Sequence, residues 1–368
     1  MIIYDSILLQ QLKGKYPRSY LNKLITRQSA ATVEFLSQLQ IMFDKLPKCK
    51  ETNEIYERLR NPERIVFWTA ATELYFIDFF SNRLGFTCKI HPPINKRSTR
   101  PEFFAERDGI KVLVEVKTLF EEKSEIQSSE MLDRIVERLK ELIPGTYSVH
   151  IIVQSSGLLP PNFKSSFVVR QVVTFVNKFM EGKNKESSRH FKVDNIEIEA
   201  YVIRTDGKNK PSFGWTTGES FVYSAERIQK AIKKKLNKYG RLDIPSVIVV
   251  DSQDFVKVGR ESVDRALFGN EQITIPFERI SGKPPLDKSK ITRDKTGLLR
   301  PNIHTRLSAI IFHRFRFFDS GDKREIYIYH NPYAKHTVTS LFNGLPQFIP
   351  VKTSKNSGYM KWINLPKE

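Results

Sequence analysis

Residues 100–118 read RPEFFAERDGIKVLVEVKT, and this stretch decides the fold. Its centre, Asp108-Gly109, is a strong two-residue signal for a β-hairpin turn, because both residue types tolerate the positive φ angles that such a turn needs. The flanking arms, 102–107 and 110–115, are equally long and rich in the aromatic and β-branched residues that favour strands. We therefore predict an antiparallel hairpin whose arms pair from end to end.

Two carboxylates meet at the open end of this hairpin. The equal arms return Glu102 to the neighbourhood of Glu115, and Lys117 lies beside Glu115 because residues two apart on a strand share a face. Paired carboxylates supply the hard oxygen ligands that Mg²⁺ prefers. A bound metal ion activates water and neutralises charge on a phosphate, and a neighbouring lysine can orient the nucleophile. The pattern predicts metal-assisted chemistry on a phosphate.

The chain before the hairpin is predicted to be helical. Residues 62–84 read as a long, nearly all-apolar helix, with Pro62 in its first turn and Gly85 as its C-terminal cap. Because it is apolar almost all round, this helix should be buried by several neighbours. Residues 1–61 read as short helices that pack on the rest of the chain.

Strands and helices alternate after the hairpin, which favours a mixed α/β layer fold. We predict helices at 129–142, 167–180 and 225–239, and strands at 147–154, 195–204, 244–250, 307–318 and 325–330. The last two strands should form an antiparallel pair.

The charge of the chain indicates a polyanionic partner. Among 368 residues, 60 Lys and Arg face 41 Asp and Glu, a formal net charge of +19, which favours nucleic acid. The two cysteines, Cys49 and Cys88, make neither a disulfide framework nor a zinc site, so we expect a reducing, cytoplasmic setting. No apolar run approaches the roughly 18 residues of a membrane span, and we expect no membrane partner and no secretory signal.

The motif Pro101-Glu102, followed by Glu115-Val116-Lys117, resembles the PD-(D/E)xK motif of the restriction-endonuclease-like nuclease superfamily. The departure is Glu102, where the family more often has aspartate. The resemblance implies an α/β fold with a restriction-endonuclease-like mixed sheet flanked by helices, into which helix 129–142, strand 147–154 and helix 167–180 would fit. We expect an N-terminal helical region (1–61), a nuclease domain (62–345) with a basic insertion around 281–300, and a C-terminal tail (346–368).

For the site, the resemblance implies that Glu102 and Glu115 hold Mg²⁺, or Mn²⁺, together with the backbone carbonyl of Val116. Lys117 would position the attacking hydroxide. Glu73, on the helix before the hairpin, matches the place of a further acidic residue and would bind a second metal ion or its water. The implied activity is a DNA endonuclease in bacterial restriction, phage defence or mobile-element biology, working alone, as a homodimer or within a multi-protein complex.

Other interpretations of these residues stay open. Glu115 and Lys117 also fit a solvated strand face with a cross-strand pair, and Asp108 is the alternative ligand if Glu102 is not one. The protein could instead be a non-catalytic nucleic-acid-binding protein that keeps the nuclease fold, or an RNA-directed nuclease.

A run of lysines lies on the helix predicted at 225–239 and just beyond it. Lys233, Lys234 and Lys238 lie off its apolar face, where they suit phosphate contact or simple solvation. We take these three lysines as the candidate nucleic-acid contacts.

Overall fold

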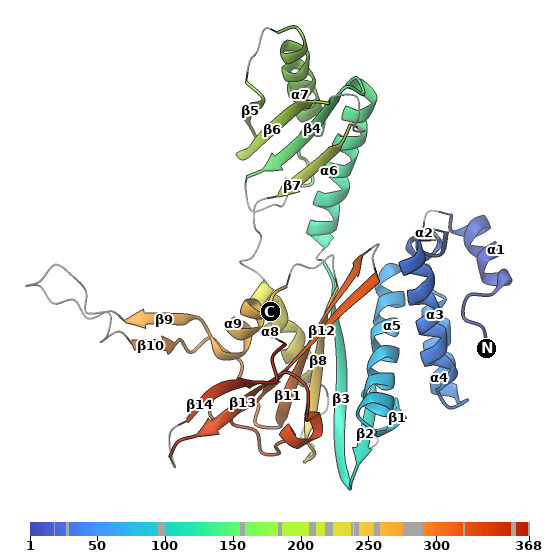
Figure 1. Cartoon of the computed structure of the whole chain (residues 1–368), viewed down its shortest axis with the longest axis vertical. Helices are drawn as coiled ribbons and strands as arrows, with labels where there is room; N and C mark the ends of the chain where they lie inside the picture. The colour runs from blue at the N-terminus through green and yellow to red at the C-terminus, as the bar shows by residue number, and fades with distance from the viewer. Residues whose placement is uncertain are drawn as a thin grey trace, which may run out of the picture. The chain divides into compact units, whose positions relative to one another are not determined.

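The computed structural model describes two compact units of the chain. The first unit comprises Met1–Phe120 and Ser224–Glu368, and the second comprises Glu121–Tyr223 (Figure 1). The described residues are all except 18, 27–28, 95–99, 122, 155–158, 183–185, 206–210, 218–223, 237, 239–242, 254–257, 275–289, 319–320, 355–357 and 367–368.

Helices make up the N-terminal part of the first unit, as predicted. They are α1 (Ser6–Lys15), α2 (Tyr20–Thr26), α3 (Ala30–Asp44), α4 (Lys50–Leu59) and α5 (Arg64–Asp78), and a π-helical turn, Phe79–Arg83, continues α5. Side chains cap the starts of α1 and α3: Asp5 accepts a hydrogen bond from the Leu8 N–H, and Ser29 accepts one from the Thr32 N–H. The helix predicted at 62–84 is confirmed, because α5 and its π turn together span Arg64–Arg83.

A large mixed sheet forms the centre of the first unit. Its strand order is β1-β2-β3-β8-β11-β12-β13-β14. The strands are β1 (Thr87–Ile90), β2 (Phe103–Arg107), β3 (Ile110–Leu119), β8 (Ser246–Ser252), β11 (Leu307–Phe318), β12 (Gly321–His330), β13 (Gln347–Lys352) and β14 (Gly358–Ile363). Strand β8 runs parallel to both β3 and β11, whereas β11 and β12 form the expected antiparallel pair.

The predicted hairpin is confirmed as β2 and β3. The register runs from Phe103 opposite Val114 to Arg107 opposite Ile110. The two turn residues, Asp108 and Gly109, have φ angles of 52° and 75°. Positive φ at both central residues is the signature of a type I′ turn, whose twist matches that of the two strands.

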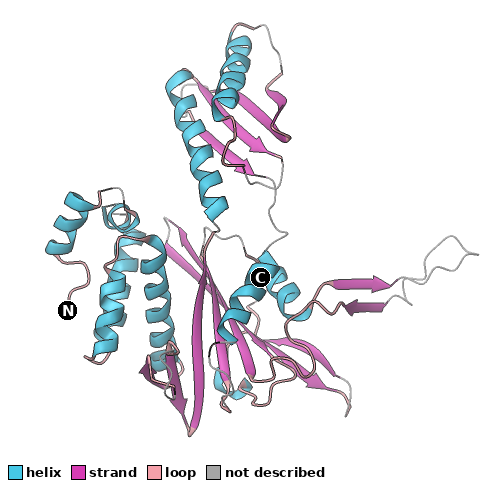
Figure 2. Ribbon diagram, turned by 180° about the vertical axis from the view of Figure 1, so that it is seen from behind, coloured by secondary structure: helices cyan, strands magenta, loops and turns pink. Residues whose placement is uncertain are grey.

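Helices cover both faces of this sheet (Figure 2). On one face, Val112, Val114 and Val116 pack in a core with Phe76 of α5 and Phe80 of the π turn. On the other face, alternate residues of β8 and β11 pack against α8 (Ser224–Leu236) and α9 (Arg260–Phe268). Because side chains alternate along a strand, α5 and α8 lie on opposite faces. The prediction of a mixed α/β sheet flanked by helices is confirmed.

The second unit has its own sheet and its own core. Its elements are α6 (Lys123–Leu142), β4 (Tyr147–Val153), α7 (Ser165–Met180), β5 (Ser188–Val193), β6 (Ile196–Arg204) and β7 (Phe213–Thr217). The strand order is β5-β6-β4-β7, and apolar side chains of the sheet pack against α6 and α7.

The neighbour of β3 differs from our expectation. The strand at 147–154, with its flanking helices, is expected in the sheet that contains the hairpin. Strand β4 instead pairs with β6 and β7, and the strand beside β3 is β8. Composition predicts that an apolar segment forms a strand. It does not predict which strand pairs with it, because tertiary packing decides the pairing.

The C-terminal residues also differ from our expectation. The expected tail from residue 346 contributes β13 and β14 to the large sheet. Of the basic insertion expected around 281–300, residues 281–289 lie outside the described part of the chain, and the described remainder includes β10 (Lys290–Arg293), paired with β9 (Glu271–Thr274). Within the described ranges, no helix has both the length and the apolar character that a membrane span requires.

Candidate active site

Glu102 and Glu115 lie side by side at the open end of the hairpin. Phe103 is paired with Val114, so the next residues outward are opposite each other. Their carboxyl groups share a hydrogen bond. The predicted meeting of the two carboxylates is therefore seen in the structure, on the sheet face that α8 covers.

A lysine ammonium group from α8 lies between the two carboxylates. Lys235 Nζ is 2.6 Å from Glu102 Oε1 and 2.5 Å from Glu115 Oε2. Just beyond α8, Lys238 Nζ lies 3.3 Å from Glu115 Oε1 and donates a hydrogen bond of 2.7 Å to the Arg100 carbonyl. Such charge-assisted contacts are shorter and stronger than neutral hydrogen bonds. Two acids and two lysines thus form one compact cluster.

Burial makes the electrostatics of this cluster strong. The Glu115 side chain is only 1% exposed, and that of Lys235 is 14% exposed. Burial, followed by the neighbouring Glu102, raises the pKa of Glu115 to about 9, although Lys235 opposes the shift. Burial also acts to raise the pKa of Glu102, but the hydrogen bond from Glu115 and the charge of Lys235 outweigh it and lower that pKa to about 2. Burial and the closeness of the two acids therefore favour a proton on Glu115, and the two carboxyl groups titrate as a coupled pair.

Lys117 follows on the same strand and face, half-buried beside the cluster. Burial lowers its pKa, and the positive charges of Lys235 and Lys234 lower it further. A lysine whose pKa is lowered exchanges a proton with water more easily than an exposed lysine does. Lys117 thus has the electrostatic setting of a group that handles a proton next to paired carboxylates.

Val116 and Asp108 also have defined places on the hairpin. The Val116 N–H donates a hydrogen bond of 3.3 Å to Glu102 Oε2, so its backbone adjoins the cluster. The part predicted for its carbonyl stays a prediction. Asp108 lies at the opposite end of the hairpin, in the turn, with its side chain 84% exposed. Its position gives Glu102, and not Asp108, the place beside Glu115.

Glu73 is not gathered with the carboxylate pair. It is buried on α5, where one oxygen contacts Arg58 Nη2 at 2.8 Å and the other contacts His91 Nε2 at 2.7 Å. Among the described residues, no group of three or more Asp, Glu, His or Cys side chains is arranged to hold a metal ion. The expected third acidic ligand is therefore replaced by a separate ion-pair cluster. Helical spacing placed Glu73 on α5 but gave no sign of its partners.

The other candidate lysines on α8 face solvent. Lys233 and Lys234 are exposed. Lys233 and Arg300 both lie near His304, because burial and then the positive charges of these two residues lower the pKa of His304. Lys234 acts on Lys117 in the same way. A band of positive charge therefore continues from the carboxylate cluster onto the surface of the first unit.

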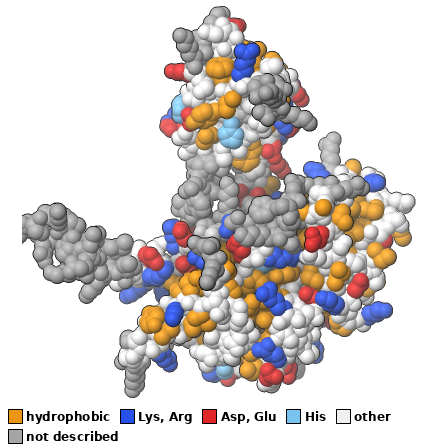
Figure 3. Space-filling view, viewed as in Figure 1, with side chains coloured by type: hydrophobic (Ala, Val, Ile, Leu, Met, Phe, Trp, Pro, Cys, Tyr) orange, Lys and Arg blue, Asp and Glu red, His pale blue; other side chains and the backbone are white. Residues whose placement is uncertain are grey.

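The excess charge belongs entirely to the first unit. Residues 121–223 carry 14 Lys and Arg against 14 Asp and Glu and are neutral, so the whole +19 lies on the remaining residues. Figure 3 shows Lys and Arg side chains spread over the visible face of that unit. The unit that holds the carboxylate cluster therefore carries all of the positive excess of the chain.

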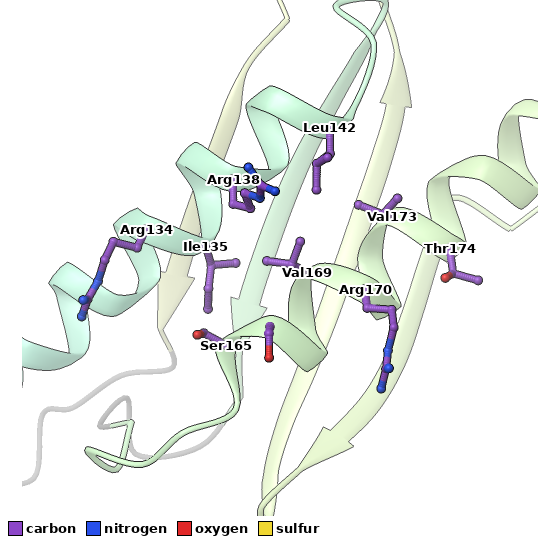
Figure 4. Close-up of a pocket in the computed structure, with 10 residues that line it drawn as sticks. Arg134, Ile135, Arg138, Leu142, Ser165, Val169, Arg170, Val173 and Thr174 are labelled. Carbon is purple, nitrogen blue, oxygen red and sulfur yellow. The ribbon is translucent and has the colours of Figure 1, made fainter.

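A groove in the second unit has a different character. It lies between α6 and α7, has a volume of about 510 Å³, and is lined by Arg134, Arg138 and Arg170 around an apolar floor that includes Ile135 and Val169 (Figure 4). Its lining contains no Asp, Glu, His or Cys. It lacks the carboxylates and other metal ligands of a metal-dependent active site, so we place the candidate site at the carboxylate cluster.

Lys235 is the site residue that sequence reasoning missed. It belongs to the run of lysines on the predicted helix but is not among the three candidate contacts. The signal was present, because Ile228, Ala231, Ile232 and Lys235 follow the i, i+3, i+4, i+7 spacing of one helix face. A lysine on the buried face of a helix needs an acidic partner, and in the structure Glu102 and Glu115 are the partners of Lys235.

Comparisons of the chain with known protein families, curated proteins and solved structures found no match. The assignment of the site rests on the geometry above.

Proposed function

We propose that this protein is a divalent-cation-dependent nuclease that hydrolyses phosphodiester bonds in DNA. The observation that carries the proposal is the pair of Glu115, which is buried, and Glu102, which is partly buried, in hydrogen-bond contact with each other and beside Lys117. Two carboxylates in a poorly hydrated place repel each other, so a protein keeps them together with a shared proton or with a compensating positive charge. If the pair binds a metal ion that acts on a phosphate, the adjacent lysine and the net charge of +19 are explained as well.

The donor set fits a hard divalent cation. Glu102 and Glu115 would hold Mg²⁺ or Mn²⁺ with their carboxylate oxygens, and Val116 would add its backbone carbonyl. Mg²⁺ commonly takes one or two carboxylates, waters and substrate phosphate. Lys235 supports the fit, because its ammonium contacts an oxygen of each acid and a positive charge therefore lies between the two carboxyl groups. When bound, the metal ion would activate water and neutralise charge on the phosphate.

Residues of the chain supply the remaining chemistry. Lys117 holds the attacking water at its Nζ and shares the water's proton, for which its lowered pKa suits it. Lys234, whose charge acts on Lys117, and the exposed Lys233 bind phosphates of the substrate strand. Glu73 has no part in this scheme, because Arg58 and His91 occupy both of its oxygens.

The fold is consistent with the family that the motif resembles. A hairpin carrying the acids, set in a mixed sheet with helices on both faces, supports a restriction-endonuclease-like nuclease. The family context would place the enzyme in restriction, phage defence or mobile-element biology inside a bacterial cell.

One observation favours a second candidate function. Lys235 and Lys238 compensate the carboxylates without any metal ion, so the cluster is also a complete structural ion-pair network. In that case the protein would bind nucleic acid through its basic first unit and would not cleave it.

Cleavage assays separate the two functions. Supercoiled plasmid and a labelled RNA are incubated with the purified protein in Mg²⁺, in Mn²⁺ and in EDTA. The nuclease proposal expects cation-dependent nicking or linearisation of DNA that is lost in Glu115→Gln and retained in Glu102→Asp. Cleavage of RNA alone would transfer the proposal to an RNA substrate. DNA binding without cleavage under every condition would establish the non-catalytic alternative.

A further inference from the structure

Lys235 holds a position that a metal ion would need. Its ammonium contacts Glu102 Oε1 and Glu115 Oε2, one oxygen of each acid. Apolar residues on the same helix face, Ile228 and Ile232, are buried in the core under α8 and orient that face of the helix, with Lys235, toward the sheet. The charge is therefore delivered to the carboxylate pair by the packing of the helix and is not a chance surface contact.

An ammonium group and a divalent cation cannot share these oxygens. Both would lie within about 3 Å of the same carboxylates. Two positive charges at such a short separation repel each other strongly in a poorly hydrated site. Lys235 has a flexible four-carbon stem, so its head can leave while its stem stays packed. Lys238 differs, because its contact with Glu115 is longer, at 3.3 Å, and its ammonium also donates a hydrogen bond to the Arg100 carbonyl.

Resting on the proposed function, we propose that Lys235 is a tethered counter-ion that exchanges with the divalent cation. Without the cation, the ammonium of Lys235 holds Glu102 and Glu115 together. When the cation binds, Lys235 leaves both carboxylates. It is a positioning residue, and it sets the cation affinity of the site through competition for the same oxygens.

Calorimetric titration with Mn²⁺ tests this exchange in the full-length protein. Lys235→Met removes the competitor, so its Mn²⁺ affinity should rise at least tenfold over wild type. Lys238→Met removes an equal charge that also touches Glu115, and it measures the purely electrostatic gain, which should stay below threefold. Lys235→Gln, which keeps a polar head, provides the same comparison if the methionine variant fails to fold.

Thermal unfolding gives a second readout that does not depend on activity. Without cation, Lys235→Met should melt below wild type, because the carboxylate pair has lost its counter-ion. Saturating Mn²⁺ should raise its melting temperature by more than it raises that of wild type.

The outcomes distinguish this proposal from the proposed function. An unchanged or weaker Mn²⁺ affinity in the Lys235 variants, with cation-dependent cleavage intact in wild type, would overturn the exchange alone. If neither wild type nor the Lys235 variants bind Mn²⁺ more tightly than Glu115→Gln, the metal site and the nuclease proposal fail together with it.

Discussion

Removing two exposed lysines from α8 should change the salt dependence of DNA binding by a calculable amount. Lys233 and Lys234 are solvent-exposed beside the carboxylate cluster, so each is placed to neutralise one phosphate. Each such contact contributes about 0.9 to the slope of log K against log salt. At 0.1 M salt the released counterions are worth about 1.2 kcal/mol per contact, or roughly eightfold in affinity. The Lys233→Ala, Lys234→Ala double variant should lose about 2 units of slope and about 60-fold in affinity.

Fluorescence anisotropy with a labelled DNA duplex at several salt concentrations measures both quantities. The matched control is Lys178→Ala with Lys192→Ala, which removes the same charge from exposed positions of the neutral second unit. The control should keep the wild-type slope. An equal loss in both double variants would mean that only bulk charge matters, and no loss in either would remove α8 from the nucleic-acid interface.

Three smaller predictions concern the scaffold. Glu73→Gln should lower the free energy of unfolding by about 2–4 kcal/mol, because it leaves Arg58 without its buried partner, but should not alter Mn²⁺ affinity; a changed affinity in calorimetry would restore Glu73 to the metal site. Although burial lowers the pKa of His91, contact with Glu73 outweighs it and raises that pKa above 6.5, so denaturant unfolding should show wild-type stability falling as pH rises from 6.5 through the folded-state pKa. His91→Gln should lack this decline, and a decline that persists would trace to another group. Gly109→Ala should cost about 1–2 kcal/mol of stability, since φ at this residue is 75°; an unchanged denaturation midpoint would contradict the type I′ turn.

Local signals were sufficient to predict the hairpin and its acids. Asp108-Gly109 defines a turn by its φ requirements, and two arms of equal length then determine which residues face each other. The meeting of Glu102 and Glu115 follows from that register, because only a few residues and one turn are involved. The long helix α5 was predicted for a similar reason, since its apolar run has a proline at one end and a glycine at the other.

The sequence pattern did not predict which strands and side chains pair when they lie far apart in the chain. The strand beside β3 is β8, and all of the second unit lies between them in the chain. Strand β4 has the same apolar character as β8, so composition alone did not separate the two. Glu73 was placed on the right helix, but its cations come from α4 and from the residue after β1. Such choices depend on tertiary packing, which overrides local propensity.

The central claim is that Lys117 serves catalysis beside the carboxylate pair. The most direct test compares Mg²⁺-dependent plasmid cleavage by Lys117→Ala and Lys111→Ala, with DNA binding measured on the same preparations. Lys111 is an exposed lysine on the same strand, stacked over Phe104, and serves as the control.

Lys117→Ala should lose at least about 100-fold in cleavage rate, because it removes a group that acts in the transition state, while its DNA affinity changes by less than about tenfold. Lys111→Ala should cut like wild type. A Lys117→Ala protein that cleaves at the wild-type rate, free of contaminating nuclease, would contradict the account.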